Sequence, residues 1–182
     1  LHFTIHSFPT RRSSDLGSDA RPAIVGYLET TPGAHFSKVR DDLGLGTGET
    51  QHHLRRLLDA GAIESRRDGD YRRFFPAGRF SAAEQTALGY LRRETPRGMV
   101  VALLREPGAS GSDLAEALSV SAPTISKYAA ALTDADLLVR DDGYRLTDSA
   151  TMLVLLVRYA DSFGEEATAL AQDAPGLITL GD

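Results

Sequence analysis

The side chains best placed for chemistry in this sequence are polar and basic residues in two clusters between positions 47 and 73. The first cluster has the spacing of one exposed helix face: Thr47, Gly48, Gln51, His52, Arg55 and Arg56. The second flanks a turn triplet: Arg66, Arg67, Arg72 and Arg73. Glutamine can read adenine and arginine can read guanine through paired hydrogen bonds, and arginine also binds phosphate. The two clusters therefore favour contact with nucleic acid.

No other combination of residues has the spacing of a reactive site. The sequence shows no Ser-His-Asp set and no catalytic carboxylate pair, and the glycines at 44 to 48 lack the lysine and the preceding strand of a phosphate loop. His52 and His53 are neighbours on a helix and point about 100° apart, so they cannot share a metal ion as an i, i+4 pair would. We expect no enzyme activity, no cofactor and no metal site, although His35, His52 and His53 leave metal sensing as an alternative.

Two short helices joined by a tight turn must position the first cluster. The first helix is predicted over residues 37 to 43 with Ser37 as its N-cap, and Gly44 and Gly46 then interrupt it. The second is predicted over residues 47 to 60 with Thr47 as its N-cap. Its apolar face is formed by Thr50, Leu54, Leu57 and Leu58. This arrangement leaves the polar cluster on the free face of the second helix.

A β-hairpin must position the second cluster. Residues 63 to 67 and 71 to 75 alternate as strands on either side of Asp68-Gly69-Asp70, whose glycine tolerates a positive φ. Because side chains alternate across a strand, two of the four arginines are expected to face DNA, where they would contact phosphates. Two alternatives to DNA binding stay open. The polar helix face could simply be solvated, and the hairpin arginines could serve to prevent edge-to-edge aggregation.

The segment PGAHFSKVRDDLGLGTGETQHHLRRLLDAGAIESRRDGDYRRFF, residues 32 to 75, resembles a winged helix-turn-helix of the ArsR/MarR kind. Within it, QHHLRRLLDAGAI is similar to the recognition-helix segment of those repressors, and PGAHFSKVRDDLGLGTGETQHHL resembles haloarchaeal transcriptional regulators. The resemblance implies that the second helix enters the major groove while the hairpin grips adjacent phosphates. It also implies that His53 braces the motif.

An internal repeat predicts a second unit of the same kind. A shift of 75 residues aligns several identities without a gap: Pro32-Gly33-Ala34 with Pro107-Gly108-Ala109, Ser37 with Ser112, Leu43 with Leu118, Leu57 with Leu132, and Asp59-Ala60 with Asp134-Ala135. Helices are predicted over residues 112 to 118 and 121 to 135, followed by a shorter hairpin at 137 to 147. The exposed face of its second helix is poor in charge: Ala122, Thr124, Ser126, Lys127, Ala130 and Ala131.

Further helices are predicted around these two units. One runs over residues 21 to 29, one over 81 to 94 with a Ser81 and Glu84 capping box, and one from 95 to 105. A long helix is predicted from Asp148 to Asp173. Its apolar stripe includes Met152, Leu155, Leu156, Tyr159 and Phe163, followed by Ala167 and Leu170. A homodimer is the simplest way to cover such a stripe; the alternative is that it packs across the chain's own domains.

Charge and composition agree with this division. The net charge is −5, but residues 21 to 80 carry ten basic residues against eight acidic ones, whereas residues 148 to 182 carry one against six. The absence of cysteine fits a reducing, cytoplasmic setting, and no apolar run could span a bilayer. A bias towards arginine, alanine, glycine and aspartate suggests a GC-rich genome, and the net negative charge suggests a salt-loving host. The resemblance to haloarchaeal regulators implies that the host is archaeal.

The predicted fold is mainly α-helical with small β-hairpins. It consists of two tandem winged helix-turn-helix domains and a long C-terminal helix. Residues 1 to 20 are interpreted as a disordered or artefactual segment, because LHFTIHSFPTRRSSDL resembles translated sequencing adaptor, and Arg11 and Arg12 are given no role. Residues 21 to 80 form the DNA-binding unit, 81 to 147 a linker helix and second unit, and 148 to 182 a dimerisation helix with a loose tail from Pro175.

The expected function is sequence-specific transcriptional regulation on double-stranded DNA as a homodimer, with a roughly palindromic operator. The alternative is a protein-interaction subunit of a chromosome or transcription complex. The acidic second unit and the long apolar helix would suit that role.

Overall fold

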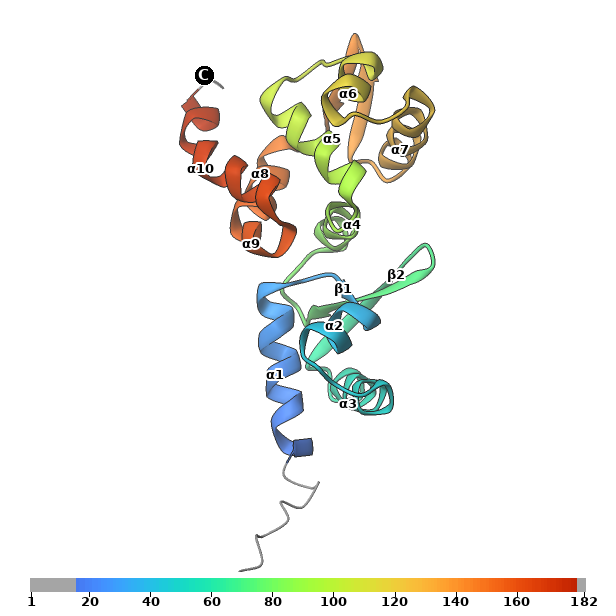
Figure 1. Cartoon of the computed structure of the whole chain (residues 1–182), viewed down its shortest axis with the longest axis vertical. Helices are drawn as coiled ribbons and strands as arrows, with labels where there is room; N and C mark the ends of the chain where they lie inside the picture. The colour runs from blue at the N-terminus through green and yellow to red at the C-terminus, as the bar shows by residue number, and fades with distance from the viewer. Residues whose placement is uncertain (1–15, 180–182) are drawn as a thin grey trace, which may run out of the picture.

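The computed structural model describes residues 16 to 179, which fold into two lobes stacked along the long axis of the molecule (Figure 1). The first lobe contains α1 (Leu16–Thr30), β1 (Ala34–His35), α2 (Phe36–Asp42), α3 (Thr47–Asp59), β2 (Ile63–Asp68) and β3 (Tyr71–Pro76). The second contains α4 (Ala82–Leu91), α5 (Glu94–Arg105), α6 (Gly111–Leu118), α7 (Ala122–Asp134), β4 (Leu138–Asp141), β5 (Gly143–Leu146), α8 (Ser149–Arg158), α9 (Ala160–Phe163) and α10 (Glu165–Thr179). The fold is mainly helical, as expected.

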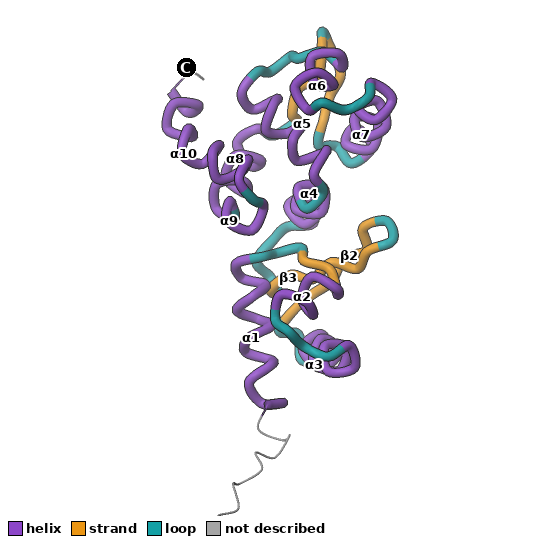
Figure 2. The backbone as a smooth tube through the Cα atoms, in the orientation of Figure 1, coloured by secondary structure: helices purple, strands orange, loops and turns teal. Residues whose placement is uncertain are grey.

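The strands form two small antiparallel sheets (Figure 2). In the first sheet the order is β1-β3-β2, and Phe74 of β3 lies between Ala34 and Ser65. In the second, β4 pairs with β5 so that Leu138 faces Leu146. No helix in the described range 16–179 has the length and apolar character needed to cross a membrane.

The first sheet separates two hydrophobic cores, because its two faces meet different lobes. Phe74 packs with Ile24, Leu54 and other apolar residues of the first lobe, whereas Phe75 packs with residues of the second lobe, among them Leu88. Neighbouring side chains on a strand point to opposite faces, so consecutive phenylalanines join both cores. Burying each contributes about 1.5–3 kcal/mol, and β3 thereby fixes the lobes to one another.

The helices predicted before residue 148 are present, but two N-caps in the first lobe differ from the sequence interpretation. His35, not Ser37, caps α2: its Nδ1 accepts a hydrogen bond from the Lys38 amide at 3.2 Å. The N-cap of α3 is Gly46, and Thr47 is the first helical residue. Glu49 reaches back and accepts a hydrogen bond from the Gly46 amide at 3.3 Å, so the side-chain bond at this helix start comes from Glu49 and Thr47 makes no cap.

The boundary at the N-terminal end was also placed too late. Helix α1 begins at Leu16, so residues 16 to 20 belong to it, and Pro22 lies within the helix. Ile24 and Leu28 supply its buried face. Residues 1 to 15, including Arg11 and Arg12, lie outside the described part of the chain.

The prediction of a single long C-terminal helix was wrong. The chain forms α8, α9 and α10 instead, with breaks at Tyr159 and at Gly164, whose φ of 102° leaves helical geometry. Helix α10 packs back onto α8, α9 and α5, and it continues past Pro175, where a tail was expected.

This reversal also corrects the predicted dimer surface. The stripe residues are all buried within the second core of the same chain: Met152, Leu155, Leu156, Tyr159 and Phe163, with Ala167 and Leu170. The stripe therefore offers no exposed apolar surface to a second copy, and the alternative that it packs within the chain is the correct one.

The repeat in the sequence is matched by repeated local geometry. Helices α3 and α7 begin and end at positions separated by the same 75 residues as the sequence identities, and so do the last residues of α1 and α5. The Gly33 amide donates to the Phe74 carbonyl at 2.9 Å, and the Gly108 amide donates to the Tyr144 carbonyl at 2.9 Å. The predicted capping box at Ser81 and Glu84 is present, Ser110 caps α6 and Ser121 caps α7.

Candidate nucleic-acid interface

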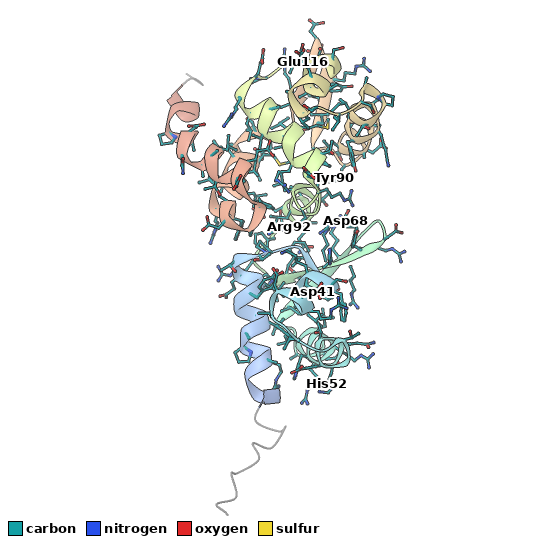
Figure 3. All side chains as sticks on the ribbon, viewed as in Figure 1. Asp41, His52, Asp68, Tyr90, Arg92 and Glu116 are labelled. Carbon is teal, nitrogen blue, oxygen red and sulfur yellow. The ribbon has the colours of Figure 1, made fainter. Side chains whose placement is uncertain are left out.

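The outer face of α3 is polar and exposed. Gly48, Gln51, His52, Arg55 and Arg56 are all exposed, as is Thr47 in the first turn of the helix. The opposite face is buried through Thr50, His53, Leu54 and Leu57. In Figure 3, His52 lies at the end of the molecule farthest from the lobe that carries Glu116. Nothing in the described chain blocks a duplex from reaching this face.

A groove connects α3 to the hairpin formed by β2 and β3, which we call the wing. Its volume is about 680 Å³. Gln51 and Arg55 line it from α3, and Arg72 lines it from β3, with Phe36 and Phe74 among the apolar residues. The polar helix face and one wing arginine therefore belong to the same side of the first lobe.

The register of the hairpin divides its four arginines between two faces. Arg67 lies opposite Arg72 and Arg66 lies opposite Arg73, so each pair shares a face. Arg72 is held on the groove side: its Nε donates to Ser65 Oγ at 2.9 Å and its guanidinium lies 5.7 Å from the centre of the Phe74 ring. Arg67 donates to the Gly69 carbonyl at 3.2 Å, at the tip of the wing.

The assignment of Arg73 to the DNA surface was wrong. Its side chain is 3% exposed, donates to the Gly33 carbonyl at 3.0 Å and pairs with Asp68. Arg73 is therefore an internal cross-link between the wing and the loop before β1. The sequence contained a signal that we missed, because Asp68 and Arg73 fall on the same hairpin face once the register is set by the turn.

The histidines have structural positions. His53 is buried on α3, its Nδ1 has no hydrogen-bond partner, and burial together with the neighbouring His52 lowers its pKa. His35 caps α2 and stacks on Tyr71 with ring centres 4.8 Å apart. Burial, followed by the charge of Arg73, lowers the pKa of His35. Among the residues that the structure describes, no three potential metal ligands cluster.

The second lobe contains a smaller groove at the corresponding place. Its volume is about 320 Å³, and it is lined from α7 by Ser126, Ala129, Ala130, Thr133 and Asp134. These positions lie 75 residues after groove residues of α3: Gln51, Leu54, Arg55, Leu58 and Asp59. Where the first groove has glutamine and arginine, the second has serine and alanine, so it offers fewer groups for reading bases.

Comparison with known proteins agrees with the geometry of the first lobe. Residues 18–88 match the family HTH_HVO_0163_N, an N-terminal HTH domain. No curated protein and no solved structure matches the chain significantly. The matched range runs from α1 into α4 and contains α3 and the wing. The chain thus carries an N-terminal helix-turn-helix domain, a class of domain that typically binds DNA.

Proposed function

We propose that this protein is a sequence-specific DNA-binding transcriptional regulator with a winged helix-turn-helix related to the ArsR/MarR kind. The observation that carries the proposal is the groove in which Gln51 and Arg55 of α3 meet Arg72 of the wing. The family match over residues 18–88 supports the same reading. A helix with free hydrogen-bonding groups beside a cationic hairpin suits a duplex, whose bases and phosphates are close together.

In this proposal α3 enters the major groove. Gln51 and Arg55 face base edges, and His52 and Arg56 lie beside them on the exposed face of the helix. Arg72 and Arg67 contact phosphates next to the groove, and these contacts fix the orientation of α3 without carrying sequence information. Arg66, which is exposed on the other face of the wing, contributes a weaker long-range attraction.

We further propose that the second lobe contains a second winged helix, formed by α5, α6, α7, β4 and β5, that does not read DNA. The equal lengths of α3 and α7 and the equivalent glycine amide bonds support a shared architecture. The serine and alanines that replace the polar groove residues of α3 argue against base reading by α7. The proposal assigns no dimer contact to the C-terminal stripe, which the chain itself buries.

A gel-shift assay on fragments of the host genome, with excess competitor DNA, tests the function. Retention of discrete fragments, lost when Gln51 and Arg55 are replaced by alanine, supports the regulator. The second candidate is a protein-interaction subunit, favoured by the charge-poor exposed face of α7. Failure to retain any fragment at any salt concentration, with the purified chain folded, would favour this second candidate.

A further inference from the structure

A cavity of about 300 Å³ lies where the two lobes meet, and its lining is strongly basic. Five basic side chains border it: Lys38 from α2, Arg73 from β3, Arg92 and Arg93 from the segment that joins α4 to α5, and Arg97 from α5 itself. No aspartate or glutamate is among its lining residues. Figure 3 shows Arg92 at the level of this junction. The cavity is separate from the groove beside α3, with which it shares no residue.

The charges around this cavity are not balanced by the protein. Lys38 pairs with Asp42 at 2.8 Å, and Asp68 serves both Arg73 and Arg93. Across the described residues, no carboxylate lies within 4.0 Å of Arg92 or Arg97. One carboxylate thus stands against four guanidinium groups, which leaves a local excess of positive charge.

Neutral carbonyl groups provide only part of the bonding that Arg92 and Arg97 require. Arg92 donates to the Pro32 carbonyl at 2.9 Å and to the Ser162 carbonyl at 2.9 Å, and Arg97 donates to the Leu91 carbonyl at 3.1 Å. The guanidinium of Arg92 also lies 4.2 Å from the centre of the Phe163 ring. These contacts fix both side chains in place before any ligand arrives.

Two donor atoms of these arginines have no acceptor. Arg92 Nη2 and Arg97 Nε are buried and make no hydrogen bond. Buried donors without a partner are rare and costly, above all on charged groups. Burial, together with the neighbouring charges of Arg73 and Arg97, lowers the pKa of Arg92 to about 9, so the group is still cationic at neutral pH. Water could fill the missing hydrogen bonds, but it would leave the charge unbalanced.

We propose that this cavity binds a small organic oxyanion, a phosphate monoester or a carboxylate, whose charged group is held by Arg92 and Arg97. Guanidinium groups bind such oxyanions through paired, charge-assisted hydrogen bonds. The volume is at the lower end of the range for small-molecule sites. Phe163 and Tyr71 offer aromatic surface for the body of the ligand. An anion here would supply the negative charge that the chain lacks.

The position of the cavity gives the ligand a route to the DNA-binding lobe. Arg73 belongs to the wing, whereas Arg92, Arg93 and Arg97 belong to the second lobe. A ligand that contacts both sides would change how firmly the wing is held, because it competes with Asp68 for Arg73 and Arg93. This effect on DNA affinity rests on the proposed function, whereas binding of the anion does not.

Isothermal titration calorimetry of the full chain without DNA tests the site. The probes are inorganic phosphate, glycerol 3-phosphate and succinate, each titrated at constant ionic strength with chloride as the reference anion. We expect saturable heat from at least one probe, and the strongest probe identifies the phosphate or the carboxylate class. Replacing Arg97 by glutamine keeps hydrogen-bond donors but removes the charge, and should weaken binding about tenfold.

Arg105→Gln is the matched control. Arg105 lies on α5 like Arg97, but its side chain is exposed and pairs with Asp173 at the surface, so binding should change less than about twofold. Circular dichroism establishes that each variant is folded. If Arg97→Gln does not fold, Arg97→Lys replaces it; lysine keeps the charge but loses the guanidinium geometry, and should still weaken binding severalfold.

Three outcomes would overturn the proposal. One is the absence of saturable heat from all three probes, and another is equal weakening by Arg97→Gln and Arg105→Gln. The third is that Arg97→Gln lowers affinity for a DNA duplex and reduces its salt dependence while no free anion binds, since the cavity would then hold a backbone phosphate. If the chain binds the probes but no DNA, the anion site is supported and only the proposed DNA-binding function is contradicted.

Discussion

Asp68, the last residue of β2 in the first lobe, pairs with Arg93, which directly precedes α5 in the second lobe. The same carboxylate pairs with Arg73 within the wing. Gly89 of α4 lies directly beside it, and a Cβ at that glycine would be 3.2 Å from Asp68 Oδ2. The wing is therefore held against α4 and α5 along one face, while its other face remains available to the groove beside α3.

Replacing Asp68 by asparagine should destabilise the chain. The substitution leaves Arg73, which is 3% exposed, without its counter-ion, and breaking a buried pair in this way costs about 3 kcal/mol. Urea unfolding measures the change. Asp70→Asn, at an exposed position of the same turn, should stay within about 0.5 kcal/mol of wild type. If the two variants have the same free energy of unfolding, the ion pairs of Asp68 do not stabilise the fold.

Replacing Gln51 or Arg55 by alanine should weaken binding to the cognate site by about 1–3 kcal/mol and leave binding to random DNA nearly unchanged. The reason is that both side chains line the groove from the exposed face of α3, where base edges would lie in the proposed complex. Fluorescence anisotropy on the two duplexes provides the comparison. If both duplexes lose the same affinity, neither residue reads bases.

Replacing Arg72 by alanine should weaken cognate and random DNA alike. Loss of one phosphate contact should also reduce the slope of log K against log salt by about 0.9. Arg66→Ala serves as the control, since Arg66 is exposed but lies on the opposite face of the wing. We expect a smaller change in slope for Arg66. A larger effect of Arg66 than of Arg72 would mean that the wing approaches DNA with its other face.

Replacing Leu156 by alanine should reduce the free energy of unfolding by about 2–5 kcal/mol, because this side chain is fully buried in the second core. The sedimentation coefficient should not change. Val154 lies on the same helix with 60% of its surface exposed, so Val154→Ala should be nearly neutral. A loss of association without a loss of stability in Leu156→Ala would restore the stripe as a contact between copies.

Stability should decrease as the pH falls from 7 to 5. Burial lowers the pKa values of His35 and His53 in the folded chain, so below about 6.5 the unfolded chain binds protons more readily and is favoured. Protonation would also remove the acceptor that His35 offers to Lys38. His35→Asn keeps a capping acceptor but does not titrate.

The midpoint of urea unfolding for His35→Asn should therefore fall less between pH 7 and pH 5 than that of the wild type. The remaining decrease is assigned to His53. An identical decrease in both proteins would contradict the role of His35.

Much of the first lobe could be predicted from local patterns. The spacing of Leu54 and Leu57 defined the buried face of α3, and the turn at Gly69 defined the hairpin to within one residue at each strand end. The cap of α2 was missed because histidine is an uncommon N-cap, and that of α3 because Gly46 was read only as a breaker. The basic cavity was not predicted at all, since its arginines are distant from Lys38 in the sequence.

The sequence by itself determined the helices up to α7, the hairpin, the repeat and the polar face of α3, because these depend on periodicity and on neighbours a few residues away. Only the tertiary structure decided which arginines are free and whether the C-terminal stripe is exposed. Arg72 and Arg73 are adjacent and chemically identical, yet the strand turns one towards the groove and the other towards α4. A strand alternates its side chains by local geometry, but what covers each face is supplied by residues far along the chain.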